Sequence, residues 1–240
     1  MNELPNVVVT GGSSGIGLRI VEDLLADGYA VTNLARRKVP IDSPNIKDFE
    51  VDLTDRVALE QVCEELKDSD ALSFVHNAGI IQPDFVTDVN LEDLDKLNQL
   101  HLGAAVQIAQ ALIPGMKAVR YGRIVIMSSR ASVGMATRTS YAATKAGQIA
   151  MARTWALELA SSGITVNTVA PGPIEATEMF HAVLPQGSTA MSDMAEQIPV
   201  GRLGLPVDVS RAVLFFIDKE NGFITGQNLF VCGGTSIGSI

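Results

Sequence analysis

The strongest constraint on the fold of this 240-residue chain is a glycine-rich segment near its start. This segment joins a short apolar run to a stretch with the apolar pattern of a helix. Asn6–Thr10 has the composition of a buried strand, and Gly15–Ala26 carries apolar residues at helical spacing. The segment reads Thr10-Gly-Gly-Ser-Ser-Gly-Ile-Gly17. Glycines permit a tight turn and a close approach to a pyrophosphate, which the amino end of the next helix stabilises. This order predicts a dinucleotide-binding strand–helix unit.

The alternation of strand and helix continues to the end of the chain. Further strands are expected at Ala30–Leu34, Lys47–Val51, Ala71–Val75, Arg123–Met127, Ile164–Val169 and Leu229–Val231. Helices are expected after an N-cap at Thr54, over Leu91–Val119 with bends at Gly103 and Pro114, and over Ser140–Ala160 and Pro206–Phe216. Apolar strands separated by helices predict an α/β fold, with a Rossmann-type doubly wound parallel sheet and helices on both faces.

No linker, charge run or repeat divides the sequence, so we expect one domain over residues 1–240. Glu175–Pro199 interrupts the alternation of strands and helices, because it is polar, rich in Met and contains Pro185 and Gly187. An irregular insertion of this length before a final helix is often a lid over a substrate, although a surface excursion would have the same pattern. We therefore expect a substrate lid at about 175–199.

Composition excludes several classes of function. The chain has 18 Lys and Arg against 27 Asp and Glu, and a net charge of −9 argues against binding to nucleic acid or to anionic lipid. Two cysteines cannot build a disulfide framework, and the run Val7–Thr10 is too short for a signal sequence or a membrane span, so a cytoplasmic protein is expected. The three histidines lack metal-ligand spacing, so no metal site is predicted: His76, His101 and His181.

The end of the second expected strand indicates which cofactor binds. Ala35 stands where an acidic residue would accept the ribose hydroxyls of NAD, and Arg36 and Arg37 follow it with no carboxylate nearby in the sequence. A guanidinium suits the 2′-phosphate of NADP(H), which is therefore the expected cofactor, although a solvated loop could carry the same arginines. Asp52, followed by Leu53, is expected on the adenine side; a simple turn is the alternative.

Further patterns follow in a fixed order along the chain: Asn77-Ala78-Gly79, Ser128-Ser129, Tyr141-x-x-x-Lys145, Asn167 with Pro171-Gly172, and Ile224-Thr-Gly-Gln227. Together with the glycine loop they resemble the short-chain dehydrogenase/reductase family, in its compact single-domain branch, over essentially the whole length. The resemblance implies a sheet of about seven parallel strands, a nicotinamide cofactor and a homotetramer, with a homodimer as the alternative.

The expected chemistry rests on three side chains. Tyr141 and Lys145 are four residues apart and so lie on one helix face, where the lysine cation would favour the phenolate and lower the pKa of the tyrosine. Tyr141 could then exchange a proton with a carbonyl or alcohol oxygen, which a serine hydroxyl would also contact. Strand register favours Ser129 as this serine, whereas the commoner loop length favours Ser128.

The resemblance also implies the set of cofactor contacts. It comprises Gly11, Ser13, Ser14, Gly15, Ile16 and Gly17 in the loop, Arg36, Arg37, Asp52 and Leu53 at the adenine side, and Asn77, Ala78, Gly79, Tyr141, Lys145, Pro171, Gly172, Ile174 and Thr177 elsewhere. Thr177 is the least fixed of these, because the segment after Gly172 is one residue longer than is usual in the family.

Two residues depart from the family pattern. His101 stands where the family has an Asn that holds a water in a proton relay; it could act as a titrating relay or simply be packed. Cys232 stands where an Asp is usual, and we interpret it as a small buried hydrophobe.

The expected function is NADP(H)-dependent reduction of a ketone or 3-oxoacyl group to a secondary alcohol, with Tyr141 as proton donor. The chain is similar to 3-oxoacyl-[acyl-carrier-protein] reductases, but Ser162 replaces a basic residue common in them, and the charge of −9 disfavours an acidic carrier. The alternatives are an NAD(P)-dependent dehydrogenase of a small secondary alcohol and a non-enzymatic NADP-binding regulator. Ser129, Tyr141 and Lys145 together argue against the regulator.

Overall fold

A seven-stranded parallel sheet forms the centre of the protein in the computed structural model, which describes residues 5–183 and 188–237. The strand order is β3-β2-β1-β4-β5-β6-β7. The strands are β1 (Asn6–Thr10), β2 (Ala30–Ala35), β3 (Ile46–Glu50), β4 (Ser73–His76), β5 (Gly122–Met127), β6 (Ile164–Pro171) and β7 (Asn228–Val231). The expected strands are thus confirmed to within about two residues at their ends, as is the doubly wound parallel sheet.

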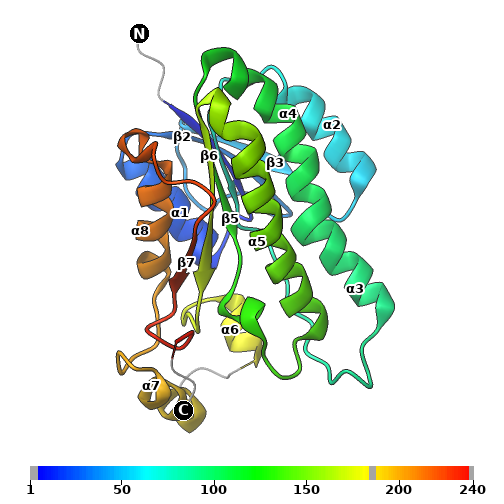
Figure 1. Cartoon of the computed structure of the whole chain (residues 1–240), viewed down its shortest axis with the longest axis vertical. Helices are drawn as coiled ribbons and strands as arrows, with labels where there is room; N and C mark the ends of the chain where they lie inside the picture. The colour runs from blue at the N-terminus through cyan, green and yellow to red at the C-terminus, as the bar shows by residue number, and fades with distance from the viewer. Residues whose placement is uncertain (1–4, 184–187, 238–240) are drawn as a thin grey trace.

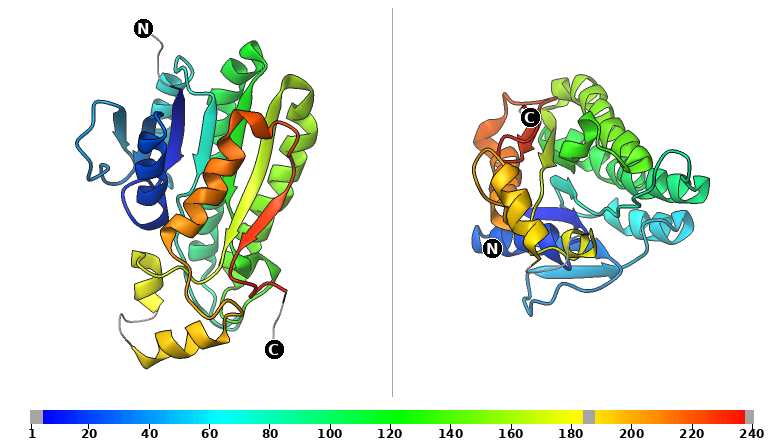
Figure 2. Two further views of the ribbon diagram at one scale, coloured as in Figure 1. Left: turned by 90° about the vertical axis from the view of Figure 1, so that its left-hand side faces the viewer. Right: turned by 90° about the horizontal axis from the view of Figure 1, so that it is seen from below.

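Helices cover both faces of the sheet (Figure 1). One face carries α1 (Gly15–Ala26) and α8 (Pro206–Ile217). The other carries α2 (Arg56–Leu66), α4 (Ala104–Val119) and α5 (Thr139–Leu159), with α3 (Leu91–Asn98) leading into α4. Two short helices, α6 (Glu178–Val183) and α7 (Thr189–Gln197), lie beyond the carboxyl ends of the strands, as the view from below shows (Figure 2).

Successive side chains of the central strand β1 point to opposite faces of the sheet, so they belong to two separate hydrophobic cores. Val7 and Val9 pack toward α1, with Ile20 as a partner, while Val8 packs toward α4, with Ile108 as a partner. All of these side chains are fully buried. Because β1 lies between β2 and β4, the strand order reverses at β1, and the crevice outside the carboxyl ends of these strands is where ligands bind in such sheets.

One local expectation was wrong. The N-cap of α2 is Asp55, not Thr54: the Asp55 carboxylate accepts hydrogen bonds from the amides of Val57 and Ala58, whereas the Thr54 hydroxyl donates to Asp52. The expected helix over Leu91–Val119 is present, and a π-helical turn at Gln99–Gly103 interrupts its regular α-helical geometry. A π-turn adds one residue to the helix and often marks a functional site.

The interrupted helix also passes a simple test for a membrane span. Leu91–Val119 is long and apolar enough by length and composition alone. In the structure, however, Ala104, Ile108 and Leu112 of this stretch belong to the core against the sheet. Its apolar character is therefore explained by packing within the domain.

The segment Glu175–Pro199 is less irregular than expected, since it contains α6 and α7. Residues 184–187 of this segment, including Pro185 and Gly187, lie outside the described residues. The described parts lie across the carboxyl edge of the sheet, next to the crevice (Figure 2).

Candidate active site

The glycine loop forms a cradle in which two of its glycines could not be replaced by residues with a side chain. Gly11 has a φ of +70°, and a Cβ on Gly17 would stand 2.0 Å from the carbonyl oxygen of Gly11. Ser14, the N-cap of α1, has extended backbone, and its side chain makes no capping hydrogen bond. The first-turn amides of α1 therefore face the crevice without a side-chain cap, which is the arrangement that binds an anion at a helix amino end.

Hydrogen bonds fix this loop to its neighbours. The buried Asn33 accepts a hydrogen bond from the amide of Gly12 at 2.9 Å. The Asn77 side chain donates to the carbonyl oxygens of Thr10 and Gly11, both at 3.2 Å. The Thr10 hydroxyl accepts in return from the amide of Asn77. The Asn77-Ala78-Gly79 pattern thus ties the end of β4 to the glycine loop.

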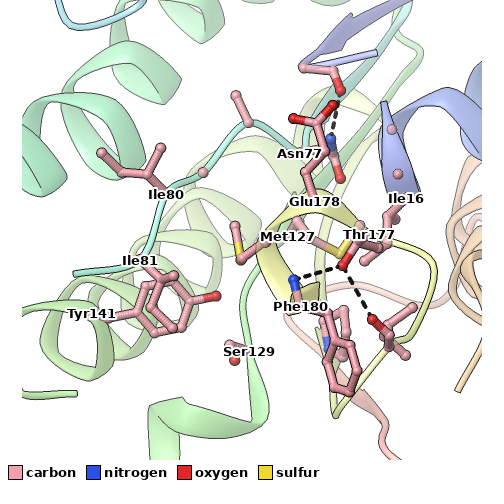
Figure 3. A pocket seen from close by; sticks show the side chains of 18 of the residues that line it. Ile16, Asn77, Ile80, Ile81, Met127, Ser129, Tyr141, Thr177, Glu178 and Phe180 are labelled. Atoms are coloured by element: carbon pink, nitrogen blue, oxygen red, sulfur yellow. Dashed lines mark hydrogen bonds between the residues drawn. The ribbon is translucent and has the colours of Figure 1, made fainter. Parts of the chain in front are cut away.

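One cleft of about 1380 Å³ contains every residue expected at the site. The glycine loop, the adenine-side residues Arg36, Arg37, Asp52 and Leu53, and Ser129, Tyr141 and Lys145 all line it. The remaining expected contacts line it as well: Asn77, Ala78, Gly79, Pro171, Gly172, Ile174 and Thr177. In the close view, Tyr141 and Ser129 lie on one side of the cleft and Ile16 on the other, with Thr177–Phe180 from the α6 region between them (Figure 3).

The arginines at the end of β2 differ in their contacts. Arg37 forms an ion pair with Glu178 of α6, in which its Nη2 donates to both carboxylate oxygens at 2.9 and 3.1 Å; the same Nη2 also reaches the Ser14 hydroxyl at 3.4 Å. The sequence suggested no nearby carboxylate because Glu178 lies 141 positions away. The Asp52 carboxylate accepts from the amide and hydroxyl of Thr54. Partial burial acts to raise the pKa of this carboxyl, but these hydrogen bonds and the nearby charge of Arg36 hold it below the usual range.

Tyr141 is buried at the inner end of the cleft. Its burial raises the pKa of the phenol above 10.0, and the nearby Ser129 hydroxyl and the charge of Arg138 act in the opposite direction. The expected lowering by Lys145 is not observed. The lysine Nζ lies 5.6 Å from the centre of the Tyr141 ring, and it donates instead to the Met127 carbonyl at 2.7 Å.

Burial also acts on Lys145. It is 2% exposed, and the loss of solvent lowers the pKa of its ammonium group to about 7. This lysine therefore changes charge near neutral pH in the structure.

The two candidate serines have different environments. The Ser128 hydroxyl is buried and donates to the Lys145 carbonyl at 2.8 Å, so its proton already takes part in a hydrogen bond to the α5 backbone. The Ser129 hydroxyl accepts from the amide of Ala131 at 3.1 Å, which leaves its proton free to face Tyr141 and the cleft. This geometry favours Ser129.

His101 lies in the π-turn and is completely buried. Its Nε2 accepts from the amide of Ile80 at 3.3 Å, so Nδ1 carries the proton and donates to the Thr144 hydroxyl at 2.8 Å. Burial and the Lys145 cation hold the pKa of His101 well below 6.5. The structure therefore favours the packed alternative for His101 over a group that titrates near neutral pH, because burial and the Lys145 cation both disfavour its charged form.

Cys232 is buried, as expected for a small hydrophobe, and its thiol contacts the Ser236 hydroxyl at 3.2 Å. Throughout residues 5–183 and 188–237, no group of three or more His, Cys, Asp or Glu side chains could hold a metal ion.

Five charged residues that line the cleft were not predicted as site residues from the sequence: Lys96, Arg130, Arg138, Glu178 and Glu196. For Arg138 a signal existed, since it precedes Tyr141 by three residues and so lies near it at the start of α5. For Glu178 there was none, because its partner is distant in the sequence.

Comparisons with known proteins agree with this geometry. The sequence family described as enoyl-(acyl carrier protein) reductase matches residues 11–236. The 3-oxoacyl-[acyl-carrier-protein] reductase FabG of Escherichia coli K12 is 34% identical over 238 residues, which is 95% of each chain.

Solved structures agree as well. One described as a short chain dehydrogenase/reductase family protein has a TM-score of 0.88 at 28% identity, covering 98% of both chains. Another, described as ElxO with NADP bound, has a TM-score of 0.88 at 28% identity, covering 96% of this chain and 98% of that one. With its strand order, glycine cradle and Tyr141–Lys145 pair, the chain belongs to the short-chain dehydrogenase/reductase family of oxidoreductases, which act on CH–OH and C=O groups.

Proposed function

We propose that the protein reduces a ketone or 3-oxoacyl group to a secondary alcohol with NADPH as the cofactor. One observation carries this proposal: the Tyr141 hydroxyl, with Ser129 beside it, faces the same cleft as the uncapped amino end of α1. A proton donor and a site for a phosphate-bearing cofactor thus meet in one cavity.

The residues present fit NADP(H). The glycine cradle and first-turn amides of α1 suit the pyrophosphate, and Arg36 and Arg37 line the cleft where a 2′-phosphate would lie. Support also comes from the structural relative whose description includes bound NADP. When bound, the cofactor supplies the hydride.

The protein supplies the proton and the orientation of the substrate. Because burial raises its pKa, Tyr141 holds its proton at neutral pH and is ready to give it to a carbonyl oxygen. Ser129, whose proton is free, would donate a hydrogen bond to the same oxygen as negative charge develops there. Lys145 would hold the nicotinamide ribose hydroxyls from beneath the tyrosine ring. The protonated tyrosine is the form that can donate a proton in the proposed reduction.

The names of the curated relatives favour a 3-oxoacyl thioester as the substrate. Two properties of this chain weigh against delivery by an acidic acyl carrier protein: the net charge of −9 and the neutral Ser162 before β6. We therefore place a free ketone or a small thioester ahead of a carrier-bound substrate.

We also propose that the chain acts as one domain and that the described parts of 175–199 serve as its substrate lid. Glu178 and Phe180 of α6 and Met194 and Gln197 of α7 line the cleft, so movement of these helices would change access to Tyr141.

A homotetramer is the assembly we propose, with a homodimer as the alternative. β7 is an edge strand, and the exposed Phe215, Phe223 and Leu229 lie on or near it and α8, a combination that a second copy would cover. Light scattering after size exclusion measures this directly, and a monomer at micromolar concentration would contradict it.

The activity is tested with a panel of ketones and 3-oxoacyl thioesters, using NADPH and NADH as cofactors. We expect turnover with NADPH in the wild type and its loss in Tyr141→Phe. Absence of any carbonyl reduction across the panel, with cofactor bound, would contradict the proposed function.

A further inference from the structure

Arg138 occupies an unusual place in the cleft. It is the N-cap residue of α5, three positions before Tyr141, and it lines the same cavity. Residues three apart at the start of a helix lie on one face of it, so the Arg138 side chain enters the cleft on the side of Tyr141. A group that the guanidinium binds would therefore lie on the same side of the cleft as the reacting carbonyl.

No carboxylate in the described ranges 5–183 and 188–237 neutralises the charge of Arg138. Neither Arg138 nor Arg130, the other cleft arginine near Ser129, forms an ion pair with a carboxylate among the described residues. Asp84 pairs with Arg138 only through the backbone, in an isolated β-bridge. A cation in a partly enclosed cleft is favourable only where an anion or solvent meets it.

Part of the guanidinium is also short of hydrogen bonds. Nη1 donates to the carbonyl oxygen of Thr137 at 3.1 Å and to the Thr137 hydroxyl. The Nε–H is buried and has no hydrogen-bond partner in the part of the chain that the structure describes. Buried donors are almost always paired, so an unpaired one beside a reaction site indicates a ligand contact.

The loop that presents Arg138 is held in a costly conformation. Thr137 has a φ of +62°, which is rare for a β-branched residue. Its carbonyl oxygen accepts from the amide of Asp84 at 3.0 Å, which helps to hold the loop in place. Such strain is typical of positions that hold a ligand or a reacting group.

We propose that Arg138 binds the carboxylate of the substrate, so that the protein is a reductase of short oxo acids. This inference rests on the proposed function and specifies its substrate class. A planar carboxylate matches the fork of donors on a guanidinium, and Nε is one of the two donors of a two-point contact. Because Arg138 precedes Tyr141 by three residues and lines the same cleft, the proposed substrates carry the carboxylate only a few bonds from the ketone.

The test compares charged and neutral forms of the same ketone. The substrates are 3-oxobutanoate, 4-oxopentanoate and their methyl esters, with NADPH, and the variants are Arg138→Gln, Arg138→Lys and the control Arg153→Gln. Arg153 is an exposed arginine on the same helix that lies outside the cleft.

We expect Arg138→Gln to lower the ratio of kcat/KM for the acid to that for its ester at least tenfold, mainly through KM. Arg138→Lys restores part of the ratio, and Arg153→Gln leaves both substrates unchanged. A ratio equal in wild type and Arg138→Gln, or a wild type that prefers the esters, overturns the inference while leaving the reductase function intact.

A binding measurement separates the two proposals. The NADPH complex is titrated with 3-hydroxybutanoate by calorimetry; an alcohol and the reduced cofactor cannot exchange a hydride, so the heat reports binding without turnover. Binding that Arg138→Gln weakens tenfold, in a protein that reduces none of the ketones, supports the anion site and contradicts the reductase function. Absence of binding together with turnover of the esters contradicts the anion site alone.

Discussion

The ion pair between Arg37 and Glu178 predicts competition between the protein and its cofactor. Glu178 approaches Arg37 at 2.9 Å, so a 2′-phosphate that binds Arg37 must displace this carboxylate or repel it. Replacing Glu178 by Gln removes the competing charge while keeping the shape of the side chain. We therefore expect Glu178→Gln to bind NADPH more tightly than the wild type does.

The size of the effect follows from the exposure of the pair. The two side chains are 61% and 67% exposed, and exposed pairs contribute about 0.2–1 kcal/mol. The Kd for NADPH should therefore fall about 1.4- to 5-fold in Glu178→Gln. In contrast, Arg37→Ala removes a charge-assisted contact of about 1.5–3 kcal/mol and should raise that Kd by roughly ten- to a hundredfold.

The assay is a fluorescence titration of each variant with NADPH and with NADH. NADH lacks the 2′-phosphate, so its Kd should not change in Glu178→Gln. Glu196→Gln is the matched control, because Glu196 also lines the cleft and its replacement changes the net charge equally without touching Arg37. The gain should shrink at high salt, since exposed charges are screened within about 8 Å at physiological ionic strength.

Two results would refute this reasoning. Equal tightening of NADPH and NADH would show that Glu178 acts through the general position of α6 rather than through the phosphate. A gain as large in Glu196→Gln would show that only net charge matters.

The remaining predictions concern the inner end of the cleft. Tyr141→Phe should keep the Kd for NADPH and lower kcat at least a hundredfold, because only the donated proton is lost; near wild-type kcat would exclude Tyr141 as the donor. Ser129→Ala should lower kcat far more than Ser128→Ala, and the reverse order would reassign the serine. Burial lowers the pKa of Lys145 from 10.5 to about 7, so between these pH values the unfolded chain binds a proton that the folded protein does not. The free energy of unfolding of the wild type, relative to that of Lys145→Met, should therefore rise from pH 7 toward pH 10. Denaturant unfolding across that range checks the sign. His101→Asn should leave the pH–rate profile between pH 6 and 8 unchanged, since His101 is neutral there, and a shifted profile would restore the titrating relay.

Much of the site was predictable because each motif follows a strand. In a parallel sheet the carboxyl ends of the strands meet at one edge, so motifs after β1, β4 and β5 must converge even when they are far apart in the sequence. The central strands were predictable because their apolar runs are buried on both faces, as β4, β5 and β6 show; the edge strands β3 and β7 are only partly buried.

Other features depend on contacts that no local pattern encodes. The π-turn at Gln99–Gly103 requires an extra residue accommodated by tertiary packing, and the sequence shows only an apolar helical run. The Arg37–Glu178 pair and the Lys145–Met127 contact join residues whose spacing carries no signal. The direction of the Tyr141 pKa was missed for this reason, because the spacing that puts Lys145 on the same helix face does not say where its ammonium points.

A buried hydrogen-bond network explains why histidine is tolerated at the π-turn. The Thr10 hydroxyl accepts from the amides of Asn77 and Ala78, so its own proton must point to Nδ1 of His76. The Nε2–H of His76 then donates to the carbonyl oxygen of Leu100 at 3.2 Å. Each donor in this series of hydrogen bonds has one acceptor. The series therefore fixes the tautomer of His76 and joins the end of β1 to the π-turn.

Hydrogen bonds also fix the tautomer of the neighbouring His101. The Ile80 amide occupies Nε2, so the Nδ1 proton goes to Thr144, whose hydroxyl donates to the carbonyl oxygen of Tyr141 at 3.0 Å. A neutral imidazole thereby supplies one acceptor and one donor, the same pair of functions that an Asn side chain offers. A charged imidazole would lose the bond from Ile80 and would face the Lys145 cation. His101 thus holds the first turn of α5, and with it Tyr141, by remaining uncharged.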